Sequence, residues 1–187
     1  MSGPLFWIVE ACWAVFLIVW AITSFQAKTS VRRGLNSAGV FWRLAVLVIV
    51  VMLSQGVARG WIPRPTPFPY GVQLAGVPLT IFGIGFAIWA RLTLGKNWGM
   101  PMTLREKPDL ITGGPYAFVR HPIYTGIALA MLGTALTFGA WWFSVLLIAL
   151  GYFAISMRQE EKDMVQHFPD AYPAYVARTK RLIPFVY

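Results

Sequence analysis

The sequence predicts an all-α membrane protein with five transmembrane helices, of which the last two form a short helical hairpin. Of its 187 residues, 57% are hydrophobic and only 12% are charged, a balance that excludes a disordered chain and is atypical of a soluble domain. The apolar residues form long runs, and the net charge of +9 lies in the short stretches between them. This pattern favours a membrane protein over one that binds nucleic acid.

Three apolar runs are long enough to cross a bilayer directly, since a transmembrane helix needs about 20 predominantly apolar residues. They are residues 4–26, with Glu10 as the only charge, residues 40–58, with Arg43 near one end, and residues 69–90, with none. No basic region precedes the first run, so we expect a retained span rather than a signal peptide. Glu10 could pair with Arg43 or line a cavity, but we favour exposure at the membrane interface.

The fourth apolar stretch, from Pro122 to Met157, contains no charged residue. As one helix it would be about 54 Å long, nearly twice the hydrocarbon thickness of a bilayer. We therefore expect it to fold back near Thr137–Ala140 into two short antiparallel helices, at residues 122–137 and 140–158. The two ends of such a hairpin return to the same membrane face, which would bring His121 close to Glu160.

The distribution of lysine and arginine predicts the orientation of this single domain, residues 1–187. With five spans, 14 of the 16 basic residues fall on one side, and only Arg59 and Arg64 fall on the other. The positive-inside rule then places the N-terminus outside and the tail, residues 159–187, in the cytoplasm. We accordingly expect a bacterial inner-membrane protein whose polar segments form a cytosolic pocket.

The first polar segment, residues 113–126, ends where the hairpin begins. Pro122 suits the first turn of a helix and biases His121 toward the cap position. His121 and Tyr124 then lie on one helix face, and Gly126 leaves room for a ligand or a neighbouring helix. The alternative is that Arg120 and His121 only mark the interface and that Tyr124 belongs to its aromatic belt.

The second polar segment contains two adjacent carboxylates, Glu160 and Glu161, at the end of the fifth span. Such a pair is commonly a solvated helix face. Adjacent helix positions diverge by about 100°, so we expect only one of the two to point inward. With one cysteine, Cys12, and two histidines in the chain, no cysteine cluster can form, and we expect no metal site.

Together these segments resemble the isoprenylcysteine carboxyl methyltransferase and phospholipid methyltransferase superfamily of integral membrane enzymes. Arg120–Gly126 matches the pattern Arg-His-Pro-x-Tyr-x-Gly, and Glu160–Glu161 matches its acidic pair. Further similarity covers roughly residues 76–185. It includes Gly83-Ile84-Gly85, Gly95–Trp98, Leu110–Tyr116 and the tail from Tyr172 through Arg178 to Pro184.

The resemblance implies a pocket for S-adenosyl-L-methionine facing the cytosol. In that pocket Tyr116, His121 and Tyr124 would contact the cofactor, together with Pro122 and Gly126 of the same motif. One of Glu160 and Glu161 would bind its hydroxyls or amino group, and Gly83 and Gly85 would allow a close approach beside it. Both glycines also fit ordinary helix packing in membranes.

The resemblance further implies methyl transfer to a lipidic acceptor, most like carboxyl O-methylation of an isoprenylcysteine-type substrate. Arg178 is the candidate for orienting the acceptor carboxylate, with Arg120 as the competitor, although both could instead bind lipid phosphates. The acceptor would reach the pocket from the bilayer between helices. Alternatives are N-methylation of a phospholipid amine such as phosphatidylethanolamine, a small transporter or a scaffold. Nothing in the sequence sets the oligomeric state.

Overall fold

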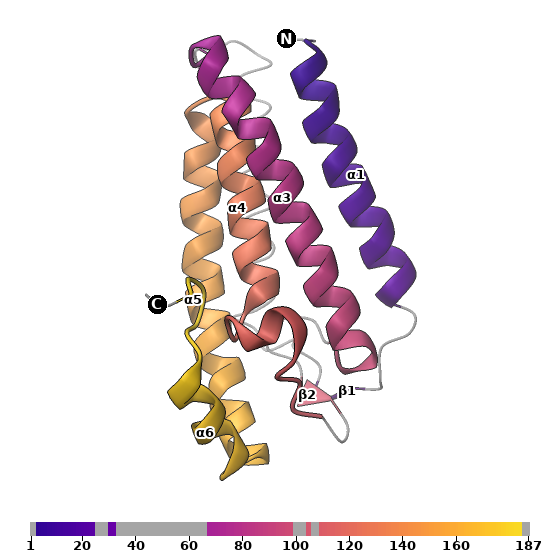
Figure 1. Cartoon of the computed structure of the whole chain (residues 1–187), viewed down its shortest axis with the longest axis vertical. Coiled ribbons are helices and arrows are strands. Elements are labelled where there is room, and N and C mark those ends of the chain that lie inside the picture. The colour runs from indigo at the N-terminus through magenta and orange to yellow at the C-terminus, as the bar shows by residue number, and fades with distance from the viewer. Residues whose placement is uncertain (1–2, 25–29, 33–66, 99–103, 106–108, 185–187) are drawn as a thin grey trace.

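The computed structural model describes residues 3–24, 30–32, 67–98, 104–105 and 109–184. Within these ranges the chain is predominantly helical, as the sequence predicts. The apolar runs form four helices that lie side by side (Figure 1), and the remaining elements are short and gather near one end of them. The long helices are α1 (Pro4–Ser24), α3 (Tyr70–Leu94), α4 (Pro122–Phe138) and α5 (Trp141–His167). The short elements are β1 (Ser30–Arg32), η1 (Gly95–Asn97), β2 (Leu104–Arg105), η2 (Gly114–Ala117) and α6 (Ala171–Arg178), with β1 and β2 paired antiparallel.

Three of the described helices, α1, α3 and α5, are long and apolar enough to cross a membrane. The shorter apolar helix α4 has 17 residues. The second expected span, residues 40–58, lies outside the described residues. The fifth predicted helix, α5, is longer than expected, because it continues past residue 158 to His167. Both glutamates therefore lie on a rigid helix rather than in a tail.

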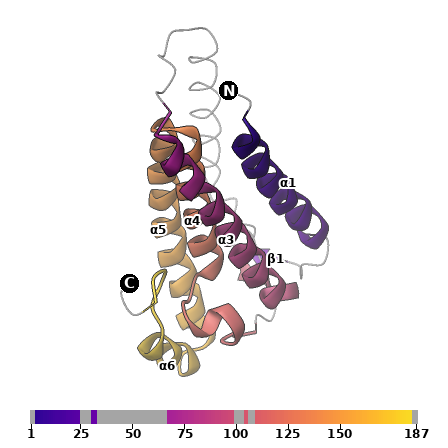
Figure 2. The same cartoon turned by 45° about the horizontal axis from the view of Figure 1, so that its top comes forward.

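The predicted hairpin is confirmed. The helix α4 ends at Phe138, α5 begins at Trp141, and Gly139 between them has a φ of 116°. That conformation favours glycine, because a Cβ atom would clash with the backbone. In both views the turn lies near the start of α1, whereas α6 and the polar segments lie at the opposite end (Figures 1 and 2).

Small residues bring α3 and α4 into backbone contact, and this interface forms the centre of the fold. Gly83 faces the backbone of Gly126 and Ala130, and a Cβ atom added at Gly126 would lie 2.6 Å from the nitrogen of Ala87. Lipid provides little hydrophobic drive for helix association, so close packing and interhelical hydrogen bonds must hold such helices together. Thr137 supplies one of these bonds by donating to the carbonyl of Gln73 at 3.2 Å.

The helix α1 is attached to α3 and α4 both in the apolar half of the molecule and at its polar end. In its apolar half, the Trp13 indole donates to the hydroxyl of Thr134 on α4 at 2.9 Å. At the polar end, the buried Arg91 guanidinium donates to the carbonyl of Thr23 at 2.6 Å. Arg91 also stacks 4.4 Å from the ring centroid of Trp98, so one side chain links the end of α1 to the loop after α3.

Candidate active site

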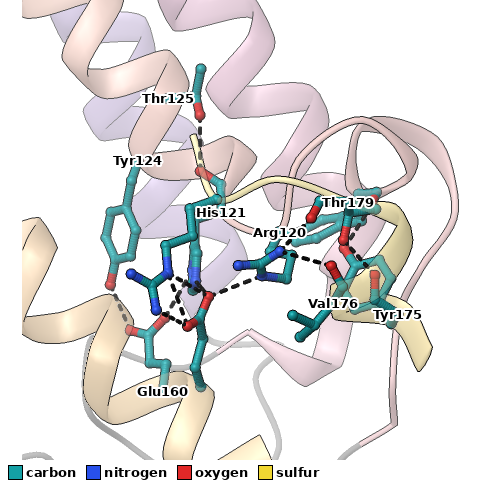
Figure 3. A network of polar contacts seen from close by, with 11 residues as sticks. Arg120, His121, Tyr124, Thr125, Glu160, Tyr175, Val176 and Thr179 are labelled. Atoms are coloured by element: carbon teal, nitrogen blue, oxygen red, sulfur yellow. Dashed lines mark hydrogen bonds and ion pairs between the residues drawn. The ribbon is translucent and has the colours of Figure 1, made fainter. Parts of the chain in front are cut away.

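The two polar segments meet at the end of the hairpin, as its geometry predicts. The His121 ring lies between the adjacent carboxylates of α5, with Nδ1 at 3.6 Å from Glu160 Oε2 and Nε2 at 3.4 Å from Glu161 Oε1 (Figure 3). His121 occupies the N-cap of α4, and Pro122 begins the helix. The cap position therefore aims the imidazole at the end of α5, although 39 residues separate His121 from Glu160 along the chain.

Glu161 is held by two guanidinium groups. Arg120 Nε donates to Glu161 Oε1 at 2.9 Å, and Arg181 Nη2 donates to Glu161 Oε2 at 2.6 Å. The Glu161 side chain is only 13% exposed and that of Arg120 is 8% exposed, so water screens the Arg120–Glu161 pair weakly. The carboxylate of Glu161 therefore connects α5 to the segment before α4 and to the C-terminal tail.

Glu160 has a different environment. Its Oε1 accepts a hydrogen bond of 2.6 Å from the hydroxyl of Tyr124, and the Tyr124 ring is stacked between His121 and Phe153, at centroid distances of 5.7 and 4.7 Å. The Oε2 of Glu160 lies 3.6 Å from Nδ1 of His121. Glu160 is thus oriented by the Tyr124 hydroxyl and by the His121 imidazole, and it has acceptor capacity left for a ligand.

The protonation of His121 follows from these neighbours. Burial alone would lower its pKa, but hydrogen bonds and charge attraction from Glu160 and Glu161 outweigh burial and raise the pKa above its ordinary value. Near neutral pH the ring is therefore more protonated than a free imidazole. An imidazolium donates from both nitrogens, which suits the two carboxylates on either side of it.

The C-terminal tail fixes the first polar segment through its backbone. The amide of Arg120 donates to the carbonyl of Lys180 at 2.8 Å, and that of His121 donates to Arg181 at 3.0 Å. On the other side of the segment, the Tyr175 hydroxyl donates to the carbonyl of Tyr116 at 2.6 Å. Burial raises the pKa of Tyr175 to about 12, so this hydroxyl keeps its proton at any physiological pH.

A cavity of about 270 Å³ opens beside this network. Aromatic and aliphatic side chains make up most of its wall, and three acids, one arginine and one histidine add charge. The charged members are Asp109, Arg120, Glu160 and Asp163, and the aromatic members are Trp20, Trp98, Tyr116, Tyr124, Phe153, Tyr172 and Tyr175, with His121 beside them. An aromatic cavity with an excess of acids suits a flat, cationic ligand.

The structure brings five of the candidate site residues to this wall: Tyr116, Arg120, His121, Tyr124 and Glu160. The other candidates lie elsewhere. Gly83 and Gly126 pack at the α3–α4 interface, and Gly85 faces open space. Pro122 is the first residue of α4 and is buried there. Arg178 is exposed on α6, with its guanidinium 5.8 Å from the ring centroid of Tyr175.

Several residues of the wall and of the polar network were not predicted from the sequence. The clearest is Arg181, whose guanidinium donates to both carboxylate oxygens of Glu161. Arg178, Lys180 and Arg181 follow one another closely in a basic tail, so no sequence signal separates them. Asp109 and Asp163 were missed for a similar reason, because single acids in polar segments are common.

A second cavity of about 800 Å³ lies between α1, α4 and α5, in the apolar half of the molecule. Its described wall is almost entirely apolar, with Glu10 as its only charged residue. Glu10 is exposed on α1, so the structure places it both at the surface and at this cavity. Ile127 and Phe153 line both cavities, and these two side chains therefore separate the polar site from the apolar one.

No three histidine, cysteine, aspartate or glutamate side chains within the described ranges are grouped so that they could hold a metal ion. The chain is similar to the cobalt-zinc-cadmium resistance protein CzcN of Cupriavidus metallidurans, with 29% identity over 76% of this chain and 62% of that protein.

Other relatives carry the names of methyltransferases. The protein-S-isoprenylcysteine O-methyltransferase of Schizosaccharomyces pombe is 34% identical over 166 residues, which cover 81% of this chain and 70% of that enzyme. A methanethiol S-methyltransferase of a Pseudomonas strain is 26% identical over 92% of this chain and 87% of that enzyme. The model of the phospholipid methyltransferase family matches residues 72–171. The resemblance inferred from the sequence is thus confirmed: the chain belongs to the phospholipid methyltransferase family and is an integral membrane methyltransferase.

Proposed function

We propose that this enzyme transfers a methyl group from S-adenosyl-L-methionine to the carboxylate of a lipidic acceptor, such as a lipidated cysteine. The observation that carries the proposal is the arrangement of the two cavities. One is aromatic and acidic, the other is apolar and lies among the membrane helices, and Ile127 and Phe153 line both. A cationic methyl donor suits the first cavity, and the hydrocarbon part of a lipid suits the second.

The residues of the polar cavity fit S-adenosylmethionine. When bound, this cofactor supplies an electrophilic methyl group on a sulfonium, and it carries a net positive charge at neutral pH. Asp109, Glu160 and Asp163 provide negative charge on the wall, and the aromatic rings offer faces for an adenine and for a cation. The two basic groups on the wall, Arg120 and His121, are paired with Glu161 and with the two glutamates respectively, so their charge is compensated and repels a cation weakly.

The two glutamates divide the work between them in this proposal. Glu160 lies on the cavity wall and accepts from Tyr124, so it is the acid that binds the hydroxyls or amino group of the cofactor. Glu161 is absent from that wall and is bound by Arg120 and Arg181. It acts as a positioning residue that holds His121 and the tail in place.

The role of orienting the acceptor had two candidates, Arg178 and Arg120. Only Arg120 lines the cavity, but its Nε is committed to Glu161 and its Nη1 donates to the carbonyl of Thr179. Arg178 is exposed and does not line the cavity, although its guanidinium lies over the ring of the wall residue Tyr175. We therefore assign Arg120 to the framework of the site and Arg178 to its surface, where its charge suits lipid phosphates.

The apolar cavity supports access from the bilayer. Its wall includes Ala14 and Leu17 of α1 together with Met131 of α4 and Ala149 of α5, so a hydrocarbon chain could lie between these helices. The excess of basic residues on one side favours a cytoplasmic active site and an external N-terminus in a bacterial inner membrane. Water exclusion and alignment would then supply most of the acceleration.

The proposal is tested by the identity of the methylated product. Purified protein in nanodiscs is incubated with labelled S-adenosylmethionine and three acceptors in parallel: a farnesylated N-acetylcysteine, methanethiol and phosphatidylethanolamine. Labelled methanol released by mild base from the farnesylated product indicates a methyl ester and supports the proposal. Exclusive methylation of the thiol or of the amine would contradict it.

A further inference from the structure

The helix α5 carries a line of polar groups that leads from the acidic cavity toward the apolar one. Tyr152, Ser156 and Glu160 are spaced four residues apart on this helix, so they lie on nearly the same face, about 6 Å apart along its axis. Glu160 lines the polar cavity and Tyr152 lines the apolar cavity. Ser156, between them, is fully buried.

The two hydroxyls of this line are unusual because neither forms a hydrogen bond of normal geometry. Within the described part of the chain, Tyr152 Oη and Ser156 Oγ are the only buried side-chain hydroxyls without such a bond, although Ser156 also interacts with the hydroxyl of Tyr124. The buried threonines of α3 and α4 behave differently. Thr80, Thr134 and Thr137 each donate to the carbonyl four residues earlier, at 2.8 to 3.1 Å, as buried hydroxyls in helices commonly do.

A buried hydroxyl without a partner destabilises a protein, because its bonds to water are lost and not replaced. Two such hydroxyls lie one helical turn apart at the boundary of two cavities, and this arrangement indicates a binding site for a ligand that accepts hydrogen bonds. Both groups are uncharged donors. They can hold an oxygen or sulfur that accepts hydrogen bonds, and they do so without forming an ion pair that would stabilise the acceptor before it reacts.

We propose that Tyr152 and Ser156 bind the polar head of the methyl acceptor, most simply a carboxylate, at the boundary between the two cavities. This inference rests on the proposed function, because it places the head beside Glu160 and the hydrocarbon tail in the apolar cavity. One rigid helix then holds both substrates, with Glu160 at the donor and Ser156 one turn away at the acceptor. On this arrangement the acceptor needs no arginine beyond the paired Arg120 among the described residues of the polar cavity wall.

The test uses Tyr152→Phe, Ser156→Ala and the double variant of the full chain in nanodiscs. Each change removes a hydroxyl and preserves the rest of the packing. We expect kcat/KM for the acceptor to fall about tenfold for Tyr152→Phe and further for the double variant, as for lost hydrogen bonds to a charged group. Affinity for S-adenosylhomocysteine should stay within about twofold, which separates acceptor binding from cofactor binding.

Thermal stability provides a second readout that does not depend on activity. Removing an unpartnered buried hydroxyl should leave the Tm unchanged or raise it, whereas a structural hydrogen bond would lower it. The matched controls are Tyr70→Phe and Ser144→Ala, at exposed positions, which should change neither quantity. A lower Tm in both variants, or unchanged kcat/KM in the double variant, would overturn the inference.

The outcomes also separate this inference from the proposed function. If the wild-type protein methylates only a thiol or an amine, the proposed carboxylate is wrong, and the same variants are measured with that acceptor. A decrease in kcat/KM with retained cofactor affinity would then still support the hydroxyl site. If the carboxylate is methylated equally well by the double variant, the proposed function stands and this inference fails.

Discussion

In the apolar half of this protein, α3 and α4 touch backbone to backbone through glycines, whereas at the polar end three distant segments meet through side chains and loop backbone. The first kind of contact leaves no room for a larger residue but involves no charge. The second brings together Arg120, Glu161 and Arg181 and would tolerate small shifts. The apolar half therefore sets the geometry of the hairpin, and the polar end uses that geometry to build a site.

The largest expected effect comes from disturbing the apolar half. Gly126→Val places a side chain against the backbone of Ala87 and Gly83, which should cost about 3 kcal/mol, at the upper end for overpacking, because the backbone cannot move aside as a side chain can. We expect little folded protein after detergent extraction, measured by size-exclusion chromatography and Tm.

Gly85→Val is the matched control, because nothing lies within 4 Å of the position where its Cβ would be. This variant should fold and should bind S-adenosylhomocysteine normally. Loss of cofactor binding with normal folding in Gly85→Val would instead support the cofactor contact that the family resemblance implies for this glycine.

The next effect compares the two adjacent glutamates. Glu160→Gln should lower affinity for S-adenosylhomocysteine by about 10- to 100-fold, as for the loss of a charge-assisted hydrogen bond, with little change in Tm. Glu161→Gln leaves Arg120 and Arg181 without their carboxylate, so its main effect should be a lower Tm.

Isothermal titration and thermal unfolding of both variants measure the two quantities side by side. Equal losses of affinity at normal Tm would show that both acids bind the cofactor and would remove the distinction. The reverse pattern, with Glu161 controlling affinity, would reassign their roles.

Access from the bilayer can be blocked at the apolar cavity. Ala14 is exposed on α1 and lines this cavity, so Ala14→Trp should fill part of it without disturbing the core. We expect kcat/KM to fall about tenfold for a farnesylated acceptor, as for the loss of a few buried methylene contacts, and to change little for a short-chain acid.

The control is Ala11→Trp, which lies one turn earlier at an exposed position outside the described wall. Equal losses for both acceptors would argue against lateral access.

A smaller effect should come from pH. The pKa of His121 is raised in the folded protein by Glu160 and Glu161, so its protonation stabilises the fold. This contribution is fully present below the ordinary pKa of about 6.5 and is lost as the pH rises through the raised value. The Tm should therefore decline over that range, and His121→Gln should flatten the decline. An equally steep decline in His121→Gln would assign it to another group.

The predictability of the two regions from the sequence also differs. The hairpin follows from one physical quantity, the length of the uncharged run between Pro122 and Met157, and the approach of His121 to Glu160 follows from the hairpin. The partners of Glu161 could not be predicted in this way. The tail is positioned by backbone hydrogen bonds from Arg120 and His121, which any sequence can form, so nothing marked Arg181 rather than Arg178.

The extent of α5 was underestimated for a related reason. The polar residues after Met157 indicate the end of a membrane span, but they do not end a helix, and α5 continues to His167. Buried Asp163, on that extension, accepts from Gln159 at 3.0 Å and lines the polar cavity. Hydropathy reports the position of the membrane boundary, whereas the site depends on a helix that crosses it.

The smallest expected effect separates these two tail arginines. Arg178 is exposed and its guanidinium is 5.8 Å from the Tyr175 ring, a contact worth about 0.5–1 kcal/mol at an exposed site. Arg178→Ala should therefore change kcat and cofactor affinity by less than about threefold. Arg181→Ala removes the bonds to both oxygens of Glu161 and should lower Tm clearly. If Arg178→Ala instead abolishes turnover while cofactor binding persists, the acceptor is oriented from α6, and the tail must close over the cavity during catalysis.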